Sequence, residues 1–136
     1  MCWTTEIGRP VSHKARKDII CYKIVPTPNS EVVYSKIFHF EYHFGKLYKT
    51  DLGKVISSPY YYSIDEGFHS YKKLPILWRD MYITAKSGFY NIHRHVIIEC
   101  VIPIGSTYYE NEFGELVSNQ IKIMKICVGI HTKSQS

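Results

Sequence analysis

The clearest strand of the chain lies in the stretch His95-Val96-Ile97-Ile98-Glu99-Cys100-Val101-Ile102-Pro103-Ile104-Gly105. Every second residue from Val96 to Ile102 is apolar, so these side chains share one face of an extended chain. Pro103 and Gly105 then interrupt the apolar run in the way that is typical of a turn. The stretch therefore predicts a strand over residues 95–102 that buries at least one of its faces.

Other segments on both sides of this stretch also have the pattern of strands. Residues 19–25 form an apolar run that prolines end, and residues 121–130 alternate apolar residues with Lys before becoming a continuous apolar run. The second half of residues 32–44 alternates, which places two sets of side chains on opposite faces: Phe38, Phe40, Tyr42 and Phe44 against Ile37, His39, Glu41 and His43. Residues 60–64 predict a further short strand.

Only residues 75–85 have the periodicity of a helix. Apolar residues recur there at three- and four-residue spacing, and Pro75 suits a first helical position. We therefore expect an α+β fold: a strand-rich single domain of two packed, mostly antiparallel sheets with one helix near 75–85. The expected organisation is a basic N-terminal arm over 1–17, the α+β domain over 18–130 and a polar tail over 131–136.

Length and composition indicate one globular domain. The chain has 136 residues, of which 45% are hydrophobic and 21% charged, and its formal net charge is +5. The cations are scattered apart from a group within residues 9–17, which argues against a nucleic-acid surface. No apolar run has the length of a membrane span, and the four cysteines are far apart in the sequence. We expect reduced cysteines, no membrane association and a cytoplasmic location, in the host cytoplasm if a phage encodes the chain.

Two clusters of histidine and glutamate deserve comparison with metal sites. His93, His95 and Glu99 lie on one face of the predicted strand and resemble the first motif of the cupin family. The flanking glycines are displaced from that motif, and Tyr108 stands where a further His would be needed. The outer histidines of His39-x-Glu41-x-His43 are two pleats apart, a wide span for one ion. We expect neither a metal nor a cofactor, and the sequence has no nucleophile motif or Gly-rich phosphate loop.

Four segments follow one another in an order that resembles the ADP-ribosyltransferase fold, which binds NAD between two short sheets. The segments are Tyr22-Lys23-Ile24-Val25, Gly67-Phe68-His69-Ser70, the strand that ends in Pro103-Ile104-Gly105, and Ser118-Asn119-Gln120-Ile121. In the family, the first carries Arg or His after an aromatic residue and the second holds the nicotinamide ribose. The last segment carries the catalytic Glu of the family.

The chain departs from that family at the positions that matter for catalysis. Gln120 stands where the catalytic Glu is expected, and a neutral amide cannot supply the negative charge that stabilises an oxocarbenium-like transition state. Lys23 replaces Arg or His and loses planar recognition of a pyrophosphate. The resemblance thus implies a non-catalytic protein that binds a small nucleotide, NAD-derived or cyclic. The implied ligand-binding residues are Tyr22, Lys23, Phe68, His69, Ser70, Tyr71 and Gln120.

Two other functions stay open from the sequence. In the first, the chain is an active ADP-ribosyltransferase-like enzyme in which Glu115 or Glu66 takes the place of the missing carboxylate. In the second, it is a structural or interaction protein, such as a virion or host-takeover component, that uses its tyrosines as contact area. The Gly-Phe-His-Ser element also resembles small proteins of phages and gut Bacteroidetes, which suggests an anti-defence role in which a phage protein sequesters an immune signalling nucleotide. A homo-oligomer is compatible with either function.

Overall fold

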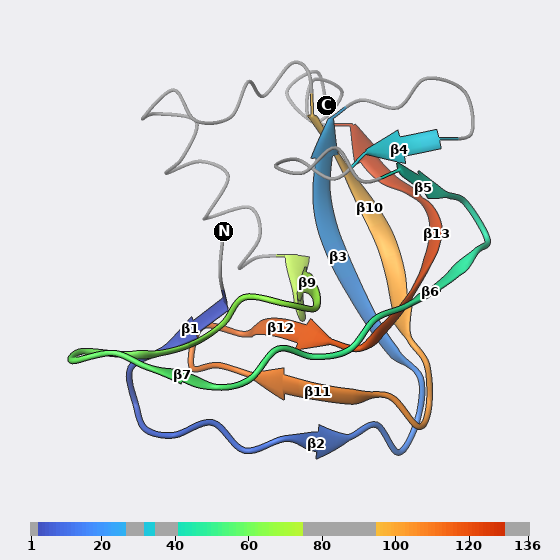
Figure 1. Ribbon diagram of the computed structural model, residues 1–136. Coiled ribbons are helices and arrows are strands. Elements are labelled where there is room, and N and C mark those ends of the chain that lie inside the picture. Colours follow the sequence, from blue (N-terminus) through green and yellow to red (C-terminus); the bar gives the residue numbers. More distant parts are fainter. Residues whose placement is uncertain (1–2, 27–31, 35–40, 75–94, 130–136) are drawn as a thin grey trace.

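The computed structural model in Figure 1 describes residues 3–26, 32–34, 41–74 and 95–129. These residues form strands joined by turns, and every described pairing between strands is antiparallel. The strands are β1 (Trp3–Thr5), β2 (His13–Lys14), β3 (Ile19–Pro26), β4 (Val32–Tyr34), β5 (Glu41–His43), β6 (Leu47–Lys49), β7 (Ile56–Ser57), β8 (Tyr62–Ile64), β9 (Phe68–Tyr71), β10 (His95–Ile102), β11 (Thr107–Glu110), β12 (Glu115–Ser118) and β13 (Gln120–Gly129).

The largest sheet has eight strands in the order β2-β11-β12-β9-β3-β10-β13-β6. Its two halves meet at one register pair, Tyr22 of β3 with Tyr71 of β9. Strands β12 and β13 are separated only by Asn119, and Figure 1 shows the chain turning sharply there from the lower half to the upper half. The sheet is therefore strongly bent, and the concave side of the bend encloses the main core.

Asn119 fixes this bend through three hydrogen bonds. Its Oδ1 accepts from the Thr107 amide at 2.9 Å, and its own amide donates to the Thr107 carbonyl at 3.1 Å. Its carbonyl accepts from the Thr50 amide at 2.9 Å. Because the backbone groups released from strand pairing are satisfied in this way, the chain can change direction without leaving them unpaired.

The long strands β3, β10 and β13 supply most of the core. These strands are long enough to pair with one another over many positions; for example, Cys21 lies opposite Cys100, and Cys100 lies opposite Ile123. Alternate side chains point into the bend and pack against β9, β12 and Tyr42. The core cluster consists of Cys21, Val25, Tyr42, Phe68, Val96, Ile98, Cys100, Ile102, Leu116, Ile121 and Ile123.

A second, three-stranded sheet, in the order β1-β8-β7, packs on the outer side of the lower half. Trp3 and Ile64 of this sheet form a buried cluster with Val117 of β12. The indole of Trp3 also donates a hydrogen bond of 2.8 Å to the Glu115 carbonyl. The strand-rich architecture and the packing of antiparallel sheets agree with the sequence prediction, whereas the helix predicted over 75–85 lies outside the described residues.

The N-terminal segment differs from the arm predicted over 1–17. β1 pairs with β8 and β2 pairs with β11, and Ala15 is buried between hydrogen bonds to Gly105 and Ser106. The sequence here is polar and basic, so its propensity gave no sign of strands, but Trp3 and Ala15 face the interior. The segment thus completes the fold. The tail predicted over 131–136 lies outside the described residues.

Candidate functional site

Lys23, Ser70 and the backbone of His69 come together where β3 meets β9. Strand alternation places Lys23 on the same face of β3 as the core residue Cys21. The Lys23 ammonium group donates a hydrogen bond to the His69 carbonyl and lies 5.7 Å from the centre of the Tyr42 ring. We call Lys23, Ser70 and the His69 carbonyl the β3–β9 site.

The charge of Lys23 is not balanced by a neighbouring acid. The side chain is partly buried, and no carboxylate of the described residues lies within 4.0 Å of its amine. Its contacts are a neutral carbonyl and the face of an aromatic ring, which stabilises a cation but does not neutralise it. An ammonium group has three N–H donors, so the His69 carbonyl leaves donor capacity for a ligand.

His69 is neutral at physiological pH. Burial lowers its pKa from 6.5 to about 4, and the positive charge of Lys23 contributes to the decrease. A neutral imidazole can donate one hydrogen bond and accept another. Successive residues of a strand point to opposite faces, so this imidazole lies on the side of Val117, its partner in β12, and away from the face that carries Ser70.

Ser70 contributes a buried hydroxyl to the same site. The residue is 3% exposed, and Ser70 Oγ has no regular hydrogen-bond partner among the described residues. It contacts the Cys21 thiol, a weak hydrogen-bonding group. Burial raises the pKa of Cys21 to about 11, against smaller lowering effects of Ser70 and Lys23, so the thiol is protonated at neutral pH.

The remaining residues implied by the sequence do not all join this group. Phe68 is buried in the core beside Tyr42, with ring centres 6.5 Å apart. Tyr22 and Tyr71 pair with each other on the other face of the sheet, where they cover Ile24 and Ile97. Burial is the largest cause of the raised pKa of Tyr22. These three aromatic residues therefore belong mainly to packing.

Gln120 lies at the start of β13 and pairs with Lys49 of β6. Its neighbour Ile121 points into the core, so strand alternation directs Gln120 to the opposite face from the one that carries Lys23 and Ser70. The sequence resemblance had implied that Gln120 faces both residues across one cleft. The bend at Asn119 separates them, because β12 remains beside β9 while β13 pairs with β10 and β6.

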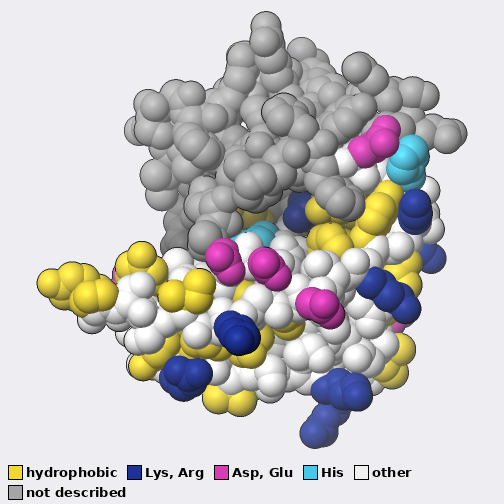
Figure 2. Space-filling model, in the orientation of Figure 1, with side chains coloured by type: hydrophobic (Ala, Val, Ile, Leu, Met, Phe, Trp, Pro, Cys, Tyr) yellow, Lys and Arg dark blue, Asp and Glu magenta, His cyan; other side chains and the backbone are white. Residues whose placement is uncertain are grey.

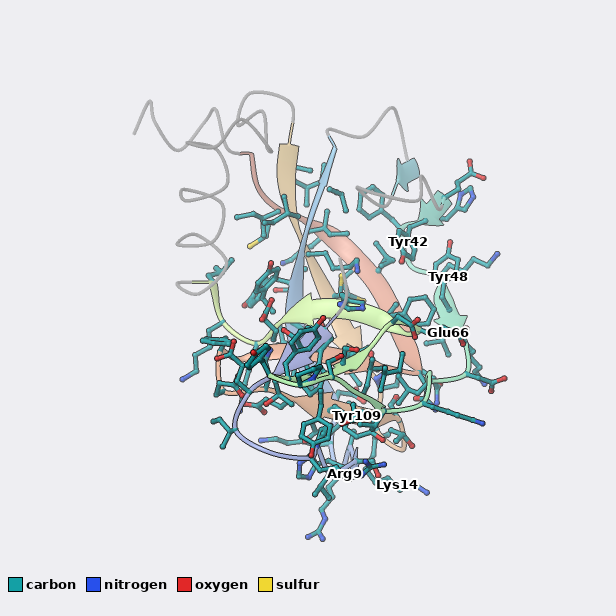
Figure 3. All side chains as sticks on the ribbon, turned by 60° about the vertical axis from the view of Figure 1, so that its left-hand side comes forward. Arg9, Lys14, Tyr42, Tyr48, Glu66 and Tyr109 are labelled. Atoms are coloured by element: carbon teal, nitrogen blue, oxygen red, sulfur yellow. The ribbon has the colours of Figure 1, made fainter. Side chains whose placement is uncertain are left out.

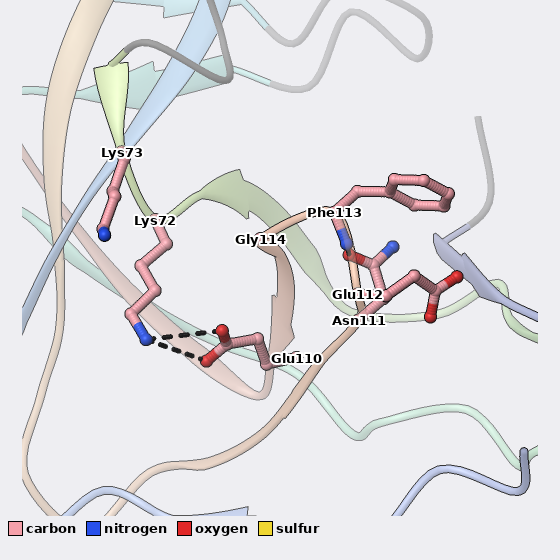
Figure 4. Close-up of a pocket in the computed structure, with 7 residues that line it drawn as sticks. All are labelled: Lys72, Lys73, Glu110, Asn111, Glu112, Phe113 and Gly114. Carbon is pink, nitrogen blue, oxygen red and sulfur yellow. Dashed lines mark hydrogen bonds and ion pairs between the residues drawn. The ribbon is translucent and has the colours of Figure 1, made fainter. Parts of the chain in front are cut away.

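The structure adds one pocket that the sequence did not indicate. It has a volume of about 350 Å³ and lies beside the turn between β11 and β12, as Figure 4 shows. Lys72 and Glu110 close one side with an ion pair of 3.2 Å. The residues that line it are Lys72, Lys73, Glu110, Asn111, Glu112, Phe113 and Gly114. We call it the turn pocket.

Asn111 organises this turn. Its Oδ1 accepts from the amides of Phe113 and Glu115, and its Nδ2 donates to the Thr4 carbonyl and to Glu115 Oε1. Gly114 has a positive φ of 76°, which closes the turn. The signal in the sequence was the Asn-Glu-Phe-Gly stretch, which is typical of a turn but does not by itself indicate a pocket.

The turn pocket has two basic residues, Lys72 and Lys73, and the β3–β9 site has Lys23. Figure 2 shows the Lys and Arg side chains of one face as separate groups, without a continuous patch. In Figure 3, Arg9 and Lys14 project from the end of the molecule opposite to Tyr42 and Tyr48. These two cations therefore lie away from Tyr42, which adjoins Lys23.

Comparisons of the chain with protein-family models, with curated proteins and with solved structures gave no match. Within the described residues, no three His, Cys, Asp or Glu side chains are grouped so that they could hold a metal ion. The described segments also include no helix with the length and apolar character needed to cross a membrane. His93 and His39, which the sequence singled out, lie outside the described residues.

Proposed function

We propose that the protein binds a small phosphorylated nucleotide, NAD-derived or cyclic, at the β3–β9 site and does not convert it. The observation that carries this proposal is the partly buried ammonium group of Lys23, which has no carboxylate partner among the described residues. Removing a cation from water without an opposite charge is unfavourable. A phosphate oxygen on Lys23 would supply that charge, and its hydrogen bond would be charge-assisted.

Ser70 supports the same ligand chemistry. Ser70 Oγ has no regular hydrogen-bond partner among the described residues beyond its weak contact with the Cys21 thiol, and a phosphate or ribose oxygen would be a better acceptor. The His69 carbonyl holds the ammonium group of Lys23 beside this strand. A cation and a hydroxyl on one face of the sheet favour a ligand that is anionic and rich in oxygen.

Binding without turnover fits the position of the acidic residues. Glu115 accepts a hydrogen bond from Asn111 at the turn pocket, and Glu66 is exposed in the turn before β9. Neither forms an ion pair with Lys23, and Gln120 carries no charge. The sequence alternative of an active transferase needs one of these carboxylates beside the ligand. If a phage encodes the chain, binding alone would withdraw a signalling nucleotide from host defence.

The experiment is a thermal-shift screen with NAD, ADP-ribose, cyclic nucleotides and inorganic phosphate, followed by calorimetry on any compound that raises Tm. A ligand that binds only the folded protein must raise Tm. Lys23→Met keeps the apolar stem and removes the charge, so it should weaken nucleotide binding by at least about tenfold. The matched control is Lys122→Met, because Lys122 is exposed on the opposite face of β13 and should leave binding unchanged.

Three results would contradict the proposal. One is that no nucleotide raises Tm, and another is that Lys23→Met binds as tightly as the wild-type chain while its circular dichroism is unchanged. The third is release of nicotinamide from NAD, which would favour the transferase alternative and direct attention to Glu66 and Glu115.

A further inference from the structure

The hairpin of β7 and β8 presents an uncovered sheet edge with an apolar tip. β7 is the last strand of the three-stranded sheet, and no described strand pairs with its outer side. Residues 55–64 contain no charged side chain. At the tip, Tyr60 is 87% exposed, and Ile56 on β7 is 44% exposed. Figure 1 shows the hairpin projecting from the side of the molecule, and hydrophobic side chains gather there in Figure 2.

The other edges of the two larger sheets are protected. Lys14 lies in β2 and Lys49 in β6, the two edges of the eight-stranded sheet, and lysine on an edge opposes pairing with another chain. At β1, the opposite edge of the small sheet, the side chain of Asn111 already donates to the Thr4 carbonyl. Of the four edge strands β1, β2, β6 and β7, β7 is therefore the one that has neither a charged residue nor a covering group among the described residues.

The backbone of Ser57 points out from this edge. The Ser58 amide donates to the Tyr61 carbonyl at 2.9 Å, so Ser58 and Tyr61 form a hydrogen-bonded pair of the hairpin. Hydrogen-bonded and non-hydrogen-bonded pairs alternate along antiparallel strands. Ser57 and Tyr62 are thus a non-hydrogen-bonded pair, and the N–H and C=O of Ser57 face away from β8.

We propose that two copies of this chain associate through β7, paired antiparallel about a two-fold axis at Ser57. A two-fold axis brings each residue near its own copy, so a charged edge would repel itself. In a chain with a net charge of +5, the uncharged β7–β8 hairpin avoids that repulsion. The two Ser57 residues would exchange N–H···O=C bonds, and Lys54 would lie opposite Tyr60 of the second copy, where a cation can contact an aromatic ring. This association does not depend on the proposed nucleotide site.

Analytical ultracentrifugation of the full chain, from low micromolar to several hundred micromolar concentration, tests the proposal. The wild-type chain should show a reversible shift from monomer to dimer. Ser57→Pro removes the outward N–H without removing a bond to β8, and it should weaken the dimer by at least about tenfold. Ile56→Lys places like charges across the axis and should abolish the dimer.

The matched control is Leu47→Lys, which makes the same kind of change at an edge residue of similar exposure, 39%, on β6. It should leave the dimer intact, and circular dichroism should show that all three variants fold. If Ser57→Pro were unfolded, Ile56→Lys would carry the test, because its side chain is exposed. A wild-type chain that stays monomeric at every concentration would overturn the proposal. So would a dimer that persists in folded Ile56→Lys, or one that only Leu47→Lys removes.

Discussion

The two ends of β9 contrast with each other although the strand has only four residues. At its start, Gly67 packs tightly against Val117 and Leu52. The β3–β9 site follows, where Ser70 is buried and the ammonium group of Lys23 has no acidic partner among the described residues. At its end, Lys72 opens into the turn pocket and forms an ion pair with Glu110. The open pocket has its charges already balanced, whereas the closely packed site does not. Unbalanced charge, more than empty volume, therefore indicates where a ligand would be stabilised.

The largest expected effect is that of Gly67→Ala at the packed end. Gly67 has a φ of 140°, and a Cβ there would lie 2.6 Å from Val117 Cγ2 and 2.7 Å from Leu52 Cδ2. We expect a loss of about 3–4 kcal/mol in the free energy of unfolding, measured by urea denaturation, because backbone strain and overpacking add. Gly105→Ala is the control: its φ is 89° but no atom lies within 4 Å, so it should lose only about 1 kcal/mol. Equal losses would show that packing at Gly67 is not the cause.

The second prediction concerns pH at the same end of β9. The pKa of His69 is about 4 in the folded chain and 6.5 when exposed, so below pH 6.5 the unfolded chain binds a proton that the folded chain does not. Stability should therefore fall as pH decreases from 6.5 to 4, by about 3 kcal/mol in total. His69→Gln should remove this part of the pH dependence, while His13→Gln, at an exposed position of β2, should keep it. An unchanged slope in His69→Gln would contradict the assignment.

The third prediction addresses the wall of the turn pocket. Asn111→Ala removes two acceptor and two donor interactions from a buried side chain, which leaves the amides of Phe113 and Glu115 without their partner. We expect a loss of about 2–3 kcal/mol in the free energy of unfolding. Asn111→Asp keeps an acceptor oxygen for these amides and should recover part of the lost stability. A loss below about 0.5 kcal/mol would mean that the turn forms without Asn111.

The smallest effect is expected at the open end of β9. Lys72→Met removes an ion pair whose side chains are both substantially exposed, 46% and 33%, so the change in stability should be under about 1 kcal/mol. It should leave nucleotide binding unchanged, in contrast to Lys23→Met. If Lys72→Met lost binding and Lys23→Met did not, the turn pocket would be the ligand site and the comparison above would be reversed.

The sequence predicted the long strands well because burial determines them. The predicted strands 19–25, 95–102 and 121–130 correspond to β3, β10 and β13 within about one residue at each end. In β5, Tyr42 is buried while Glu41 and His43 are exposed, as the alternation predicts. The predicted strand 60–64 starts later, at Tyr62, because Pro59 and Tyr60 form the turn of the hairpin.

The sequence pattern did not predict the short strands, nor how the candidate site residues lie relative to one another. β1, β2 and β7 have two or three residues each, too few for a period to be recognised, and the partners of β1 and β2 lie far away in the chain. The pattern proposed Lys23, His69 and Ser70 as parts of one ligand site; in the structure Lys23 contacts the His69 carbonyl, and Ser70 contacts Cys21 on the face that carries Lys23. It could not place Gln120, because the bend at Asn119 decides which face of the sheet that residue joins.

The hydrogen bond from the Trp3 indole to the Glu115 carbonyl has a consequence for how the chain folds. It joins residues 112 positions apart, and the cluster of Trp3, Ile64 and Val117 is assembled from three segments that are far apart in the sequence. Closing such a long loop costs conformational entropy before any contact compensates for it. Folding also becomes slower as the mean sequence separation of contacting residues grows. During synthesis, β1 must remain unpaired with this cluster until β12 has left the ribosome. Trp3 therefore stays accessible to chaperones and proteases until β12 has been synthesised.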